Sequence, residues 1–126
     1  MAALAVLRRP DFFKAAAAGA PVVDWLDYDT HYTERYLDLP DRNPDAYRAA
    51  NLLTHAAGLT RPLLLIHGTA DDNVYFFQSL KLAEALLRAG RSFDFLPLPR
   101  VTHQIADPAL REQVWQRVAG FLLGKI

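Results

Sequence analysis

The segment Pro62-Leu-Leu-Leu-Ile66, followed by His67-Gly-Thr-Ala-Asp-Asp-Asn-Val-Tyr-Phe76, decides the fold of this chain. A short apolar run bounded by punctuating residues is typical of a buried strand in a parallel sheet. After this segment the apolar spacing changes and predicts a helix that presents four leucines on one face, Leu80, Leu82, Leu86 and Leu87. A buried strand, a polar loop and a helix together indicate one unit of an α/β sheet.

Two adjacent carboxylates, Asp71 and Asp72, lie in the loop directly after this strand. In open α/β sheets, ligands bind at the edge formed by the carboxyl ends of the strands. The pair therefore indicates a functional site. A structural alternative is that one aspartate caps the following helix while the other faces solvent. This segment alone leaves both interpretations open.

The composition is that of an ordinary globular domain. A chain of 126 residues suits a single domain and can bury a core, and 52% of its residues are hydrophobic. Lys and Arg together number 14, as do Asp and Glu, so the formal net charge is zero. This balance gives no indication of a nucleic-acid partner or of an anionic membrane partner. The absence of cysteine excludes disulfides, thiolate metal sites and a cysteine nucleophile.

No apolar run approaches the roughly 20 residues that span a membrane, and the sequence predicts a soluble chain with no membrane partner. At the N-terminus, Arg8 and Arg9 follow the apolar stretch instead of preceding it, which is the wrong order for a signal peptide. The compartment stays open. The four histidines are isolated, so we expect neither a metal nor an organic cofactor.

The first forty residues predict one helix and leave the structure of two further segments open. Residues 1–7 predict a helix that stops before Pro10 and has no capping residue in front of it. Residues 13–19 are alanine-rich and fit either a helix or a tightly packed buried strand. Residues 22–40 are irregular, with aromatic side chains three and four residues apart, at Trp25, Tyr28, Tyr32 and Tyr36. Such a stripe is either core packing or the wall of a small-molecule pocket.

The remaining elements complete an α/β pattern. Residues 41–59 predict a loop and then a helix, with Asn43 as N-cap and Pro44 at the first helical position. Residues 93–98 predict a strand, and residues 107–123 a helix that turns four side chains inward, Val114, Val118, Phe121 and Leu122. With right-handed crossovers this order predicts about three parallel strands with helices on both faces.

The loop after the last predicted strand carries His103. Adjacent parallel strands bring this loop and the Asp71 loop to the same edge, where an Asp–His hydrogen bond is geometrically natural. A carboxylate on one imidazole nitrogen fixes the tautomer and leaves the other nitrogen as a general base. Acid and then base is the second half of the α/β-hydrolase order Ser, Asp, His. The alternative for His103 is a histidine in a surface loop.

The chain does not contain the serine that this chemistry requires. An α/β hydrolase carries its nucleophile on a Gly-x-Ser-x-Gly turn between a strand and a helix. The two serines of this chain are Ser79, inside a predicted helix, and Ser92, at the start of a strand, and neither has flanking glycines.

Two long motifs in register, His67-Gly-Thr-Ala-Asp-Asp-Asn-Val and Tyr28-Asp-Thr-His-Tyr-Thr-Glu-Arg-Tyr36, closely resemble segments of the dipeptidyl peptidase IV group of the prolyl oligopeptidase family. The segment 17–22 with Trp25, and the late histidine loop, fit the same pattern. The resemblance covers essentially the whole chain. It implies a serine peptidase with a C-terminal α/β-hydrolase domain, which releases N-terminal dipeptides with proline or alanine in second position.

The resemblance also implies roles for individual residues. Asp71 matches the triad aspartate and His103 the triad histidine. Five residues match the walls of the pocket that holds the proline ring: Tyr28, Tyr32, Trp25, Val22 and Val74. Asn73 matches an asparagine that hydrogen-bonds a substrate carbonyl. Gln104 differs from the family, in which glycine commonly follows the histidine.

The family's serine motif directly precedes the residues that match Met1. The resemblance therefore implies that residues 1–126 are one partial catalytic domain, beginning just after the nucleophile, and that the isolated chain is inactive. The competing hypothesis is a non-catalytic α/β fragment that serves as a structural or interaction module. Either way, a sheet of about three strands has an open apolar edge, which predicts a homodimer or sheet-edge association.

Overall fold

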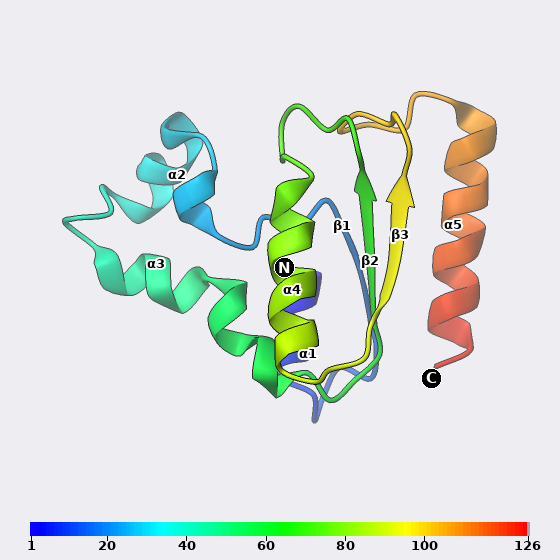
Figure 1. Ribbon diagram of the computed structural model, residues 1–126, viewed down its shortest axis with the longest axis horizontal. Helices are drawn as coiled ribbons and strands as arrows, with labels where there is room; N and C mark the ends of the chain where they lie inside the picture. The colour runs from blue at the N-terminus through cyan, green and yellow to red at the C-terminus, as the bar shows by residue number, and fades with distance from the viewer. Residues whose placement is uncertain (126) are drawn as a thin grey trace.

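The computed structural model describes residues 1–125 and is built around a three-stranded parallel sheet in the order β1-β2-β3 (Figure 1). The strands are β1 (Ala16–Gly19), β2 (Leu63–Gly68) and β3 (Asp94–Leu98). All six residues of β2 are buried, as expected for a central strand. The predicted arrangement of about three parallel strands with flanking helices is confirmed.

The alanine-rich segment forms the strand β1, which decides between the two structures that its sequence allowed. Ala16 and Ala18 are buried, and Ala18 lies in register with Leu65 of β2. The helix α1 (Ala2–Arg8) packs against this strand, with Val6 fully buried between them and the rest of the core. Small side chains on β1 let the helix lie close to the sheet, so tertiary packing overrides the helical preference of alanine.

Helices cover both faces of the sheet (Figure 1). On one face α1, the 3₁₀ segment η2 (Leu52–Gly58) and α4 (Phe77–Arg88) enclose the larger hydrophobic core. On the other face α5 (Pro108–Leu123) packs its Val114, Val118 and Phe121 against the sheet. Leu122 is half-buried.

The segment between β1 and β2 contains η1 (Trp25–Asp27), α2 (Thr30–Leu37) and α3 (Pro44–Ala50), which lie beside α4, away from the sheet (Figure 1). The single helix expected over residues 44–59 is divided into α3 and η2. At Asn51 the backbone is extended, and the Asn51 side chain accepts a hydrogen bond from the Leu53 N–H. Asn43 does precede α3, but its side chain makes no capping bond and donates to the Leu37 carbonyl instead.

The expected buried face of α4 is wrong in part. Leu82 and Leu86 are fully buried, whereas Leu80 is 48% and Leu87 68% exposed. Each helical residue rotates by about 100°, so Leu80 and Leu82 point to opposite sides of the helix. Two polar residues, Gln78 and Ser79, occupy the buried face together with the two inward leucines.

None of the helices formed by residues 1–125 combines the length and the hydrophobicity needed to cross a bilayer. Within the same residues, no three or more acidic or histidine side chains are grouped so that they could hold a metal ion.

Candidate active site

The loop between β2 and α4 holds Asp71 at the carboxyl edge of the sheet, and the side chain is almost completely buried. Its Oδ1 accepts hydrogen bonds from the backbone N–H groups of Asn73 (3.0 Å) and Val74 (2.9 Å). These bonds fold the loop back on the carboxylate. The position before α4 is taken by Phe76, whose side chain makes no cap. Neither aspartate therefore caps the helix, and Asp72 lies exposed.

The loop after β3 is held directly against the Asp71 loop. The Ala70 N–H donates to the Val101 carbonyl, and the Arg100 N–H donates to the Thr69 hydroxyl. At Gly68 the two backbones are so close that an added Cβ would lie 2.2 Å from the Val101 carbonyl oxygen. The left-handed residue of this loop is Arg100, with φ 61°, and not Gln104. The loop therefore reaches its conformation without glycine after the histidine.

This packing brings His103 to Asp71. The His103 Nδ1 lies 2.9 Å from the Asp71 Oδ2. Since an ionised carboxylate only accepts, Nδ1 carries the proton and donates it, and Nε2 of the neutral ring is the free, basic nitrogen. The histidine side chain is 38% accessible, whereas the aspartate is buried. Beside the pair lies a cavity of about 260 Å³ that extends to Gly19 and Ala20 at the end of β1.

The aromatic segment forms a compact group of rings. The planes of Trp25 and Tyr32 are stacked within 13°, with ring centroids 5.9 Å apart, and Tyr28 meets both edge-on. Tyr36 continues the row beyond Tyr32. Edge-to-face and offset pairs are favourable aromatic geometries, so these side chains hold one another in place. The structure therefore brings together three of the five residues expected to form a pocket wall.

The Tyr28 hydroxyl joins this ring group to the Asp71 loop, because it donates a 2.8 Å hydrogen bond to the Asn73 Oδ1. Burial, reinforced by the negative charge of Asp29, raises the pKa of Tyr28, so the hydroxyl keeps its proton in neutral solution. With its oxygen occupied, the Asn73 amide has its N–H groups left to offer to a ligand. Both residues line a cavity of about 510 Å³.

The other two expected pocket residues, Val22 and Val74, lie in the segments on either side of this contact. Val22 is half-buried in the irregular segment after β1, ahead of the ring group. Val74 is buried, and its backbone N–H binds Asp71.

Sequence reasoning missed three buried polar residues that support this edge. His67 bonds through its two ring nitrogens to Ser79 and to the Val74 carbonyl. Gln78 accepts bonds from the backbone N–H groups of Val23 and Asp24, which lead into the ring group. One signal was available, because His67 directly follows four consecutive apolar residues of a buried strand.

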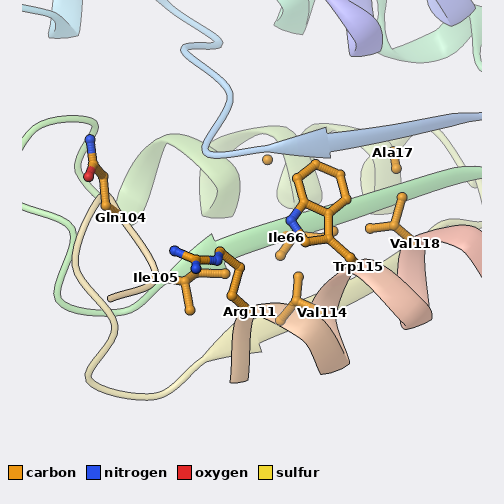
Figure 2. Close-up of a pocket in the computed structure, with 9 residues that line it drawn as sticks. Ala17, Ile66, Gln104, Ile105, Arg111, Val114, Trp115 and Val118 are labelled. Atoms are coloured by element: carbon orange, nitrogen blue, oxygen red, sulfur yellow. The ribbon is translucent and has the colours of Figure 1, made fainter. Parts of the chain in front are cut away.

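A third concave surface lies between the sheet and α5, next to the cavity beside the Asp71–His103 pair. This groove of about 430 Å³ is mostly apolar. Figure 2 shows Trp115 and Arg111 projecting from α5 over the sheet beside Ile66, with Ala17 of β1 at one side. The indole of Trp115 is 65% exposed. The groove adjoins the outer edge of β1, which has no partner strand among the described residues.

Comparison with known proteins agrees with this architecture. The model of the prolyl oligopeptidase family matches residues 1–126. The chain is 41% identical to human dipeptidyl peptidase 8 over 108 residues, which is 83% of this chain and 12% of that protein. It is 40% identical to bovine dipeptidyl peptidase 4 over 113 residues, 87% of this chain and 15% of that protein. The chain thus spans less than a fifth of the length of these relatives.

Solved structures give the same result. Dipeptidyl peptidase 4 of Porphyromonas gingivalis superposes with a TM-score of 0.93 at 35% identity, over 98% of this chain and 18% of that one. A Bacteroides ovatus structure superposes over the whole chain with a TM-score of 0.96 at 32% identity. The fold is that of the C-terminal part of an α/β hydrolase. Within that class, the chain belongs to the prolyl oligopeptidase family of serine peptidases.

Proposed function

We propose that this chain is the C-terminal part of the catalytic domain of a serine-type dipeptidyl peptidase, with Asp71 and His103 as two members of its catalytic triad. One observation carries the proposal: the 2.9 Å contact between the buried Asp71 Oδ2 and the His103 Nδ1, at the edge where parallel sheets place their chemistry. The serine would come from polypeptide outside these residues.

In this mechanism the free Nε2 of His103 takes the proton of the serine hydroxyl as its oxygen attacks the scissile carbonyl. The resulting imidazolium gives that proton to the departing amine, and water then repeats the cycle to release the acyl group. Asp71 keeps the ring in the required tautomer and stabilises its positive charge. Burial suits this role, because a fixed carboxylate in a water-poor setting interacts strongly with the imidazolium.

We further propose that Trp25, Tyr28, Tyr32, Val22 and Val74 form the pocket for the second residue of the substrate. Flat aromatic faces suit the rigid ring of proline, and the smaller side chain of alanine would fit the same apolar wall. The amide of Asn73, oriented by Tyr28, would donate to a substrate carbonyl. The expected substrates are therefore peptides with Pro or Ala second from the N-terminus.

The test uses the full-length polypeptide that carries these residues. Hydrolysis of a Gly-Pro anilide should fall about 10⁴-fold in Asp71→Asn, because the amide holds the histidine in the wrong tautomer. The rate of hydrolysis should fall at least as much in His103→Ala. The matched controls are Asp94→Asn, at the opposite end of the sheet, and His55→Ala on η2, both of which should keep full activity. Undiminished hydrolysis in Asp71→Asn would overturn the proposal.

Expressed alone, the 126 residues should not hydrolyse this substrate, because Ser79 is buried and bonded to His67. Activity of the pure chain that disappears in His103→Ala would contradict this expectation. A non-catalytic structural or interaction module is the second candidate function. It is favoured by the edge of β1 that pairs with no strand of residues 1–125 and by the adjoining apolar groove, which also support self-association as a homodimer.

A further inference from the structure

His67, the last residue but one of β2, is a buried histidine that the mechanism above does not use. Its exposed fraction is 1%, and it is one of the residues around the cavity beside Asp71 and His103. The Phe76 ring packs edge-on against the imidazole at 5.5 Å and itself stacks on Phe95 of β3. The orientation of the imidazole is therefore fixed by packing as well as by hydrogen bonds.

Each ring nitrogen of His67 has a hydrogen-bond partner. Its Nε2 lies 2.7 Å from the Val74 carbonyl oxygen, which can only accept, so Nε2 carries a proton. Its Nδ1 lies 2.7 Å from the Ser79 Oγ. In the neutral ring Nδ1 is an acceptor, and the serine hydroxyl donates to it. The Val74 carbonyl, which cannot donate, thereby selects the tautomer, and the Ser79 hydroxyl adapts to it by donating to Nδ1.

Val74 connects this histidine to Asp71. The Val74 carbonyl accepts from His67, while the Val74 N–H donates to the Asp71 Oδ1. The His67 Nε2 also lies 3.4 Å from the Asp71 Oδ2, with both side chains excluded from solvent. A continuous set of contacts therefore runs from Ser79 on α4, through His67 and Val74, to the carboxylate that contacts His103.

We propose that His67 is a positioning residue for Asp71. It clamps the backbone of Val74 and so holds the carboxylate with Oδ1 turned inward and Oδ2 turned toward His103. The proposal rests on the proposed function, since it assigns His67 to the support of the triad. The imidazole suits this task because it offers a donor on one side and an acceptor on the other, within a rigid ring.

The decisive comparison is between two amides at position 67 in the full-length peptidase. In His67→Gln the side-chain nitrogen can occupy the place of Nε2 and still donate to Val74. In His67→Asn the shorter amide reaches only the place of Nδ1. We expect kcat to fall about 10- to 100-fold in His67→Asn, as is typical when a supporting hydrogen bond of a site is lost. His67→Gln should recover most of this loss.

Ser79→Ala removes the hydroxyl that bonds the His67 Nδ1 and should lower kcat by a smaller factor than His67→Asn. The matched control is Ser92→Ala, an exposed serine in the loop before β3, which should leave kcat unchanged. Equal losses in the Gln and Asn variants would mean that His67 only fills space, and would overturn the proposal.

A second measurement does not depend on activity. In protein labelled with ¹⁵N-histidine, NMR should report His67 as a neutral ring with its proton on Nε2, and His67→Asn should shift the His103 Nδ1–H resonance. A proton on Nδ1 of His67 would overturn the clamp. If Asp71→Asn kept full activity, the proposed function would fail while the NMR result still decided the clamp. If Asp71→Asn were inactive and His67→Asn fully active, only the clamp would fail.

Discussion

At Gly68 the last residue of β2 touches the backbone of the histidine loop, and this contact sets the distance between the two halves of the candidate site. A methyl group at this position would lie 2.2 Å from the Val101 carbonyl oxygen and 2.8 Å from that of Thr102. Backbone atoms cannot move aside as a flexible side chain can. The glycine is therefore required by the close approach of two chain segments.

Gly68→Ala should destabilise the protein by about 1–3 kcal/mol or more, because the added methyl group forces the His103 loop away. Chemical denaturation measures the change in free energy of unfolding. Gly120→Ala is the matched control, since a Cβ there meets nothing within 4 Å on the helix α5. It should stabilise the protein by about 0.5–1 kcal/mol. Equal changes in the free energy of unfolding for the two substitutions would show that the close backbone approach at Gly68 is not what requires glycine there.

Asp11 is the residue with the largest resolved change in acidity. Its hydrogen bonds with the Arg9 side chain lower the pKa of Asp11 from its usual 3.8 to about 2. Because the folded value is the lower one, the pair stabilises the folded state above pH 3.8, and this contribution disappears as the pH falls through 2. NMR titration should give a pKa near 2 for Asp11, and near the usual value in Arg9→Gln. If the pKa of Asp11 stayed near 2 in Arg9→Gln, Arg9 would not be the cause of its lowered value.

At the scale of elements, the first turn of α4 makes hydrogen bonds to two separate parts of the candidate site, the ring group and the Asp71 loop. Gln78 and Ser79 are adjacent and buried, and each uses its side chain to bond outside the helix. Gln78 accepts hydrogen bonds from the extended segment that leads into the ring group. Ser79 bonds to His67, which in turn bonds to the Asp71 loop. The spacing of the leucines could not reveal this, because polar residues on a buried face are indistinguishable by type from solvent-facing ones.

Gln78→Leu should lower the free energy of unfolding by about 1–3 kcal/mol or more, since it removes the acceptor of the buried Val23 N–H and of the partly buried Asp24 N–H. Thermal and urea unfolding measure the loss. The control Gln116→Leu changes an exposed glutamine of α5 and should stay within about 0.5 kcal/mol. If Gln116→Leu lost as much stability as Gln78→Leu, the hydrogen bonds that Gln78 accepts would not be the cause of the loss.

The helices and strands differ in how closely the sequence alone predicted them. The strands β2 and β3 and the helices α4 and α5 were predicted close to their observed positions, because strong apolar periodicity fixes them locally. The segment that became β1 was undecided, since alanine fits a helix and only contact with α1 and β2 selects the strand. The division at Asn51 was missed, because it depends on a side-chain bond within the loop.

For the whole molecule, the exposed edge of β1 and the apolar groove beside it are the features most open to association. In the 126-residue polypeptide expressed alone, we expect self-association, measured by light scattering at micromolar concentration. Ala17→Lys places a charge on the edge strand within the groove and should shift the polypeptide toward monomer. Asp45→Lys on exposed α3 is the control and should leave the assembly unchanged. A monomer at all concentrations would contradict the expectation.

The sequence by itself determined the class of fold, the family and the two residues that meet at the candidate site. It could do so because a buried strand followed by a polar loop and a helix is a local pattern, and because the motifs are contiguous. The tertiary structure decided that β1 is a strand, that His67, Ser79 and Gln78 are buried supports, and that Gly68 admits no side chain. These depend on contacts between segments far apart in the chain, and no local pattern of residue types encodes such distances.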